Sequence, residues 1–114
     1  MKILNATQGT IIASHARRAD SFLSRMVGLL DRRAIQQGEG LIISGCRSIH
    51  MLFMKFPIDV IFISRQERVV GLLKGIKPFC LSPVFWKAHA AIELPVGVIE
   101  NSKTSLGDMV RIED

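Results

Sequence analysis

The sequence predicts a mainly β (α+β) fold: a compact β sandwich or small barrel with one helix in the N-terminal half and a short helical turn. Short apolar runs are separated by turns rich in Gly, Pro, Asn and Asp, which is typical of all-β architectures. Segment 22–30 instead places its apolar residues at helical spacing. Segment 58–63 is apolar on both faces, which indicates a central strand buried on each side.

The elements of the first half can be placed in order. Segment 2–14 predicts two short strands joined by a turn at 7–9, and segment 40–44 predicts another strand. Between them a helix is expected, capped by Asp20 or Ser21. Its apolar stripe is formed by Phe22, Met26, Leu29 and Leu30.

The second half is organised around Pro57, which breaks a long apolar run because proline cannot donate to a sheet ladder. The strand at 58–63 is followed by a polar turn at 64–68, and 69–76 returns as its hairpin partner. Gly71 in that partner predicts a bulge or the close approach of another backbone. Three further elements are expected: a strand at 90–95, a helical turn at 96–102 and a closing strand at 108–114.

Length and composition predict one domain spanning residues 1–114, because 114 residues is near the commonest domain size. The hydrophobic content of 48% and the charged content of 22% are those of an ordinary globular chain rather than a disordered one. The start, with polar Asn5 and Thr7, does not resemble a signal peptide. No apolar segment reaches the ~20 residues of a membrane helix, so we expect a cytoplasmic location and no membrane span.

The net charge of +5 is unevenly distributed along the chain. Between residues 47 and 87 only Asp59 and Glu67 are acidic, and such an excess of positive charge favours anionic partners. Aromatic residues for base stacking are scarce, with no Tyr, which argues against nucleic acid as the partner. The seven basic residues of this range are Arg47, Lys55, Arg65, Arg68, Lys74, Lys77 and Lys87.

Asp59 is the strongest single indication of a site. It lies on an otherwise apolar strand beside Pro57, and a buried carboxylate must be hydrogen-bonded, paired with a cation or protonated. One interpretation is structural, with backbone N–H groups at the Pro57 turn or an Arg satisfying the carboxylate. The other makes Asp59 a general base, a ligand contact or a metal ligand.

His50 and Trp86 are two further candidates. His50 opens an apolar run, where a histidine is either a satisfied strand-end residue or a proton carrier near neutral pH. It faces the same cavity as Asp59 if the chain folds back at Pro57. Trp86 lies in the loop-like segment 82–89, either as a lid over the sheet edge or as the aromatic wall of a pocket with Met51 and Met54 as adaptable neighbours.

The cysteines and histidines give only a weak metal signal. Two cysteines are too few for a disulfide framework, so Cys46 and Cys80 are expected to be free thiols. Together with His50 and His89 they would make a set of zinc ligands, but no tight Cys-x-x-Cys pair is present and no metal site is predicted. Glycine-rich phosphate loops are absent as well, and no cofactor is predicted.

Four blocks of the sequence, in their order, resemble the uncharacterised family called domain of unknown function 192. The blocks are Gly28-Leu29-Leu30, Met54-x-x-Pro57-Ile58-Asp59, Glu93-Leu94-Pro95-x-Gly97 and Gly107-Asp108. The resemblance covers nearly the whole chain. It implies a compact, mainly β domain with a small helical element and no established reaction. It also implies that Asp59 and the 93–97 turn share a site, either for folding or for function.

Three hypotheses about function follow. The first is a non-enzymatic domain that binds an unidentified small molecule or protein in a groove near the central strand, with contacts from Met54, Asp59, Trp86 and Glu93. The second is a small acid–base, hydrolase-like enzyme with His50 and Asp59 as catalytic residues. The third is a weak anion or nucleic-acid binder that uses the basic middle of the chain. A pocket that holds His50 and Asp59 would favour the enzyme, and a continuous Arg/Lys face away from any pocket would favour the anion binder. An exposed apolar groove with neither feature would favour a partner surface.

Overall fold

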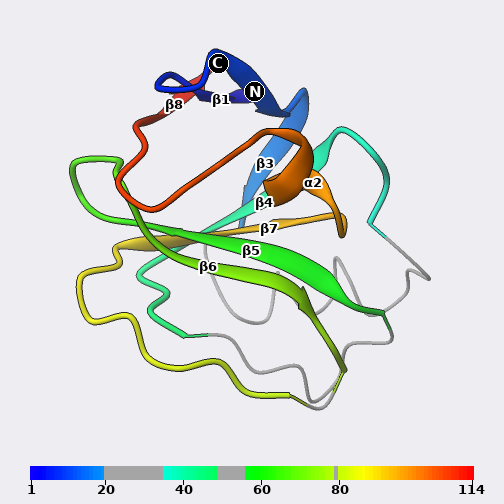
Figure 1. Cartoon of the computed structure of the whole chain (residues 1–114), viewed down its shortest axis with the longest axis vertical. Helices are drawn as coiled ribbons and strands as arrows, with labels where there is room; N and C mark the ends of the chain where they lie inside the picture. Colours follow the sequence, from blue (N-terminus) through cyan, green and yellow to red (C-terminus); the bar gives the residue numbers. More distant parts are fainter. Residues whose placement is uncertain (20–34, 49–55, 79) are drawn as a thin grey trace.

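The computed structural model describes residues 1–19, 35–48, 56–78 and 80–114, and it has a mainly β fold in two sheets (Figure 1). The mainly β prediction is confirmed. A three-stranded sheet has the order β2-β1-β8, and a five-stranded sheet has the order β3-β4-β7-β5-β6. The elements are β1 (Lys2–Asn5), β2 (Thr10–Ala13), β3 (His15–Ala19), β4 (Glu39–Ser44), β5 (Ile58–Ile63), β6 (Val69–Ile76), β7 (Ala90–Leu94), α2 (Val98–Asn101) and β8 (Val110–Glu113).

Strand β5 is a central strand of the larger sheet. It lies between β7 and β6, antiparallel to both, and all six of its residues are buried. The polar turn at 64–68 joins it to β6, so the predicted hairpin is confirmed. A segment that is apolar on both faces is suited to the centre of a sheet, because each face of the strand there packs against a separate core.

Two cores cover the two faces of the five-stranded sheet. The first lies between the sheets, because it combines Ile3 and Ile12 of the small sheet with Ile61 and Ile92 of the large one. The short helix α2 contributes Val98 and Ile99 to the same core. The second core lies on the opposite face of the large sheet and contains Leu41, Ile43, Phe56, Ile58, Val60, Phe62 and Ala91.

The three-stranded sheet brings the two ends of the chain together. Strand β1 pairs antiparallel with both β2 and β8, and Lys2 lies opposite Glu113 (Figure 1). The predicted strand pair in segment 2–14 and the closing strand are therefore confirmed. Strand β3 was not predicted. Its sequence His-Ala-Arg-Arg-Ala has little apolar character, and it forms by parallel pairing with β4 at the sheet edge.

Helical structure in the described residues matches the sequence where the two can be compared. The short helix expected within 96–102 is α2, which Gly97 precedes with a left-handed φ of 100°. The longer helix expected after Asp20 lies outside the described residues. Among those residues, no helix has the length and apolar character required to cross a membrane.

Candidate functional site

The carboxylate of Asp59 is buried and fully engaged by backbone donors. Its Oδ1 accepts a hydrogen bond from the N–H of Gly75 at 2.8 Å. Its Oδ2 accepts from the N–H groups of Gly97 and Ile99, each at 3.1 Å. The residue is 1% exposed. Asp59 therefore joins the far end of β6 to the first turn of α2, whose N–H groups have no partner within the helix.

These contacts match the structural interpretation of Asp59, with one difference in its partners. The donors are Gly75 of β6, Gly97 just before α2 and Ile99 within α2, not the turn at Pro57. The pairing of β5 with β6 shifts register between Ile58 and Val60, which brings the N–H of Gly75 to the side chain of Asp59. A carboxylate that accepts three N–H bonds without solvent access is well suited to holding backbone in place.

Glu93 is buried too, but it lies on the other face of the sheet. It sits in the middle of β7, opposite Leu41 of β4 and Val60 of β5, and its exposure is 0%. Because side chains alternate along a strand, Glu93 shares the face of Ala91, whereas Asp59 shares the face of Leu94. Thus Asp59 meets the 93–97 turn through the backbone of Gly97, and the two carboxylates are separated by the sheet.

A third buried carboxylate, Asp108, anchors the loop before β8. Its Oδ2 accepts hydrogen bonds from Asn5 at 3.0 Å, from the Ser105 N–H at 2.9 Å and from Gln8 at 3.2 Å. Asn5 also donates to Thr104 at 3.1 Å. The hydrogen bond from Asn5, supported by those from Ser105 and Gln8, holds the pKa of Asp108 below its ordinary value, although burial acts in the opposite direction. The negative charge therefore stabilises this junction of β1 and β8.

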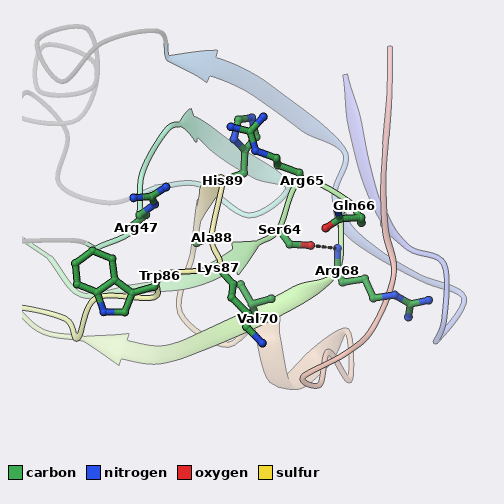
Figure 2. Close-up of a pocket in the computed structure, with 10 residues that line it drawn as sticks. All are labelled: Arg47, Ser64, Arg65, Gln66, Arg68, Val70, Trp86, Lys87, Ala88 and His89. Atoms are coloured by element: carbon green, nitrogen blue, oxygen red, sulfur yellow. Dashed lines mark hydrogen bonds between the residues drawn. The ribbon is translucent and has the colours of Figure 1, made fainter.

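An open cleft of about 590 Å³ lies at the opposite end of β5 from Asp59 (Figure 2). We call it the basic cleft. Its rim is formed by the β5–β6 turn, and the segment that leads into β7 forms another side. The described lining residues are Arg47, Ser64, Arg65, Gln66, Arg68, Val70, Trp86, Lys87, Ala88 and His89.

The charge of the basic cleft has one sign, since its described lining includes three arginines, a lysine and a histidine but no carboxylate. The guanidinium of Arg68 donates to the carbonyl of Gly107 at 3.0 Å, so this side chain braces the neighbouring turn. Arg47, Arg65 and Lys87 are exposed, and among the described residues their side chains make no ion pair. Three cations are thus held near one concave surface, an arrangement that attracts anions.

Two adjacent aromatic residues of the loop before β7 have opposite environments. The ring of Phe85 packs on Phe62 with a centroid distance of 4.4 Å, and it occupies the space that a side chain at Gly71 would need. The next residue, Trp86, is 75% exposed. The β5–β6 pairing shifts register between Phe62 and Ile63, next to Gly71, so the predicted bulge is present. The close approach at Gly71 is made by the Phe85 ring and not by another backbone. Phe85, not Trp86, packs over the sheet, and Trp86 lines the cleft.

Backbone hydrogen bonds fix this loop on the ends of the large sheet. The N–H of Phe85 donates to the carbonyl of Arg47 at 2.7 Å, and the N–H of His89 donates to the carbonyl of Ile63 at 2.7 Å. The N–H of Gly45 donates to the carbonyl of His89 at 2.6 Å. Residues from three separate parts of the sequence therefore form one cleft.

The sequence-predicted site residues divide into three groups. Trp86 lines the basic cleft, whereas neither Asp59 nor Glu93 does. His50 and Met54 lie outside the described residues, so the predicted pairing of His50 with Asp59 stays a prediction. Neither Cys46 nor Cys80 is in a disulfide, as expected. No group of three or more His, Cys, Asp or Glu side chains in the described ranges is placed to hold a metal ion.

The cleft residues other than Trp86 were not assigned to a site from the sequence. Arg47, Arg65, Arg68 and Lys87 were recognised only as members of the basic middle of the chain, which is the signal that points to them. His89 was considered only as a metal ligand. Their spacing over 43 positions, from 47 to 89, gives no local motif, because the cleft forms only when β5 and β7 pair.

Comparison with known proteins identifies the family. The model of DUF192, described as "Uncharacterized ACR", matches residues 3–112. The chain belongs to the DUF192 family. This DUF192 chain is 34% identical over 109 residues to a UPF0127 protein of Pyrococcus furiosus, a match that covers 93% of each chain. It is also 34% identical over 112 residues to a UPF0127 protein of Thermococcus sibiricus, which covers 95% of this chain and 72% of that protein.

A solved structure shares the fold of this DUF192 chain. It is a protein of unknown function from Novosphingobium aromaticivorans, with a TM-score of 0.80 and 20% sequence identity. The match covers 98% of this chain and 84% of the other. The resemblance predicted from the four sequence blocks is thereby confirmed. Neither the family description nor these relatives names a reaction or a ligand.

Proposed function

We propose that this DUF192 domain is a non-enzymatic binding module that holds a small anionic ligand in the basic cleft. The observation that carries the proposal is the concentration of Arg47, Arg65 and Lys87 around one concavity whose described lining has no carboxylate. Positive side chains that repel one another in a folded protein are expected where an anion compensates their charge. Guanidinium groups bind carboxylate and phosphate oxygens with charge-assisted, often bidentate hydrogen bonds.

The size and the neutral lining of the cleft also suit a small molecule. A volume of about 590 Å³ falls within the range of ligand pockets, roughly 300–1,000 Å³. The Ser64 hydroxyl accepts a hydrogen bond from the Arg68 N–H at 3.3 Å, and its own proton is available to a ligand. The side chain of Gln66, which is exposed at the rim, adds a neutral donor and acceptor.

Binding is favoured over acid–base catalysis by the contacts of Asp59. A general base must reach a proton of the substrate, and the Asp59 oxygens are buried and accept three backbone N–H bonds. The basic cleft has no carboxylate among its described residues to take that role. The hydrolase-like alternative with His50 stays a prediction, as does the cytoplasmic location.

The experiment that tests the proposal measures anion binding by thermal shift and by isothermal titration calorimetry. Phosphate, pyrophosphate and citrate are compared with neutral glucose at low and at high salt. We expect at least one of the anions to raise Tm, with an effect that weakens as salt screens the cleft. Arg65→Glu should lower the affinity for that anion by about tenfold or more, because repulsion replaces a charge-assisted hydrogen bond.

The matched control is Lys74→Glu, which makes the same charge change at an exposed position of β6 outside the cleft lining. It should alter affinity far less than Arg65→Glu. The proposal is wrong if none of the anions binds at low salt, or if the two variants weaken binding equally. Equal weakening would mean that overall charge, rather than the cleft, attracts the anion.

A further inference from the structure

We infer that the ligand of the basic cleft is a nucleoside phosphate unit, with its base stacked on Trp86 and its phosphate held by Arg47, Arg65 and Lys87. This inference rests on the proposed function and specifies the chemical class of the ligand. The decisive juxtaposition is an exposed indole that lines the same cleft as three exposed cations (Figure 2). A phosphate and a planar ring in one molecule would use both features.

The exposure of Trp86 is unusual for its position in the fold. At 75% it is the most exposed of the large hydrophobic residues in the described part of the chain, although it directly follows the anchored Phe85. An indole left in water gains nothing for folding, whereas a base that stacks on an aromatic ring gains roughly 1–3 kcal/mol. Trp86 is therefore placed to contact something outside the protein.

The cations extend along the cleft from the indole. Figure 2 shows Arg47 beside Trp86, and it shows Arg68 with Ser64 and Gln66 at the opposite end of the drawn residues. The backbone of Arg47 is held to the loop by the hydrogen bond from Phe85. A ligand whose base lies on Trp86 would thus direct its phosphate toward the guanidinium groups, which bind phosphate oxygens in preference to most other groups.

A single nucleotide unit fits the cleft better than a run of stacked bases. Trp86 is the only tryptophan of the chain, which has no tyrosine. The neighbouring Phe85 ring already packs against Phe62. Single-strand binding proteins instead present a series of aromatic side chains on which successive bases stack. A free nucleotide and a unit of single-stranded nucleic acid share the recognised chemistry, and the experiment below separates them.

The sole tryptophan gives a direct reading of this site, because the tryptophan fluorescence of the chain comes from Trp86 alone. The protein is titrated with AMP, ribose 5-phosphate and adenosine, and calorimetry supplies the affinities. We expect AMP to quench the fluorescence of Trp86 and to bind roughly 5- to 150-fold more tightly than ribose 5-phosphate, which is the range expected from one stacked base. Adenosine should also bind more weakly than AMP, because it lacks the phosphate.

Two variants of Trp86 separate stacking from general packing. Trp86→Ala should weaken AMP binding by a similar factor, roughly 5- to 150-fold, and leave the binding of ribose 5-phosphate unchanged. Trp86→Phe should restore part of the loss. Val84→Ala serves as the control, since Val84 is 44% exposed in the same loop but does not line the cleft. It should bind AMP as the wild type does.

The outcomes distinguish this inference from the proposed function. If ribose 5-phosphate binds as tightly as AMP, and Trp86→Ala binds both normally, the nucleoside assignment is wrong while the anion site stands. If no phosphate compound binds, the nucleoside assignment is wrong, and the proposed anion site fails with it only if citrate does not bind either. A short oligoadenylate that binds much more tightly than AMP, with a steep salt dependence, would support the nucleoside phosphate unit and make nucleic acid its source.

Discussion

The two ends of strand β5 show how differently charged side chains can be used in one fold. At the start of the strand, Asp59 is buried and each of its oxygens accepts backbone N–H bonds. Just past the end, Arg65 is exposed in the turn that borders the basic cleft. From Asp59 to Ser64 the strand advances roughly 16 Å, at about 3.3 Å per residue. At one end a buried carboxylate links the backbones of β6 and α2, and at the other end a charged side chain is exposed to solvent.

The difference shows that a conspicuous sequence motif and a concave, charged surface need not coincide. The family-like blocks at 54–59, 93–97 and 107–108 contain Asp59 and Asp108, whose partners are all within the protein. The cations of the basic cleft belong to none of these blocks. If this contrast is correct, substitutions at the carboxylates should mainly change stability, and substitutions in the cleft should mainly change binding.

The largest effect on stability is expected for Asp59→Asn. An amide can accept on only one side, so at least one of the three N–H groups loses its acceptor and the charge assistance disappears. We expect a loss of about 2–4 kcal/mol in the free energy of unfolding, measured by urea denaturation. Glu100→Gln is the control, because it removes a negative charge from an exposed position of α2. A variant as stable as the control would contradict the structural role.

Gly71→Ala should have the next largest effect and should connect the two regions. A Cβ at this position would lie 2.5 Å from the ring of Phe85, which must then leave its place on Phe62. Overpacking of this kind costs about 1–3 kcal/mol. In a Phe85→Ala background the same change should cost much less, and the double-mutant cycle measures the difference. Additive losses would show that Phe85 does not occupy this space in solution.

Asp108→Asn should produce a smaller loss that depends on pH. Because the folded pKa of Asp108 is lowered, its charge stabilises the protein above the unfolded pKa, about 3.9, and this contribution is lost as pH falls through the folded pKa. At neutral pH we expect the variant to lose about 1 kcal/mol. As pH falls through the folded pKa, its stability should approach that of the wild type, because Asp108 becomes neutral. If the stability difference between the variant and the wild type were constant from neutral pH to about pH 3, this charge effect would be excluded.

The smallest effect on stability is expected for Arg65→Ala, which removes an exposed side chain with no ion pair among the described residues. The free energy of unfolding should change by no more than about 0.5 kcal/mol. Anion affinity, measured by calorimetry on the same samples, should fall. A large loss of stability would mean that Arg65 supports the fold, and the contrast between the two ends of β5 would disappear.

Much of the fold could be predicted because the pattern of apolar residues is local. The two-sided apolar segment at 58–63 and the polar turn after it define the β5–β6 hairpin without reference to the rest of the chain. Strand β3 could not be predicted in this way. Its pairing with β4 supplies what its own sequence lacks.

The candidate site was harder to predict for the same physical reason. The sequence identifies Asp59 as unusual, but it does not reveal donors that lie 16, 38 and 40 residues away. It also shows an excess of positive charge between 47 and 87 without showing that Arg47, Arg65 and Lys87 surround one concavity. Trp86 was predicted as a candidate because of its loop-like context, and the structure adds that its neighbour Phe85 provides the packing.

The anchoring of Phe85 has a consequence for how fast and at what thermodynamic cost the cleft can be occupied. Because this ring and the backbone hydrogen bonds of its loop hold the backbone around Trp86 in position, little backbone entropy needs to be lost when a ligand arrives. Association should then be limited by diffusion and assisted by the field of the nearby cations, without a slow closing step. Stopped-flow traces should be single-exponential, with rates that rise linearly with ligand concentration and fall as salt is added.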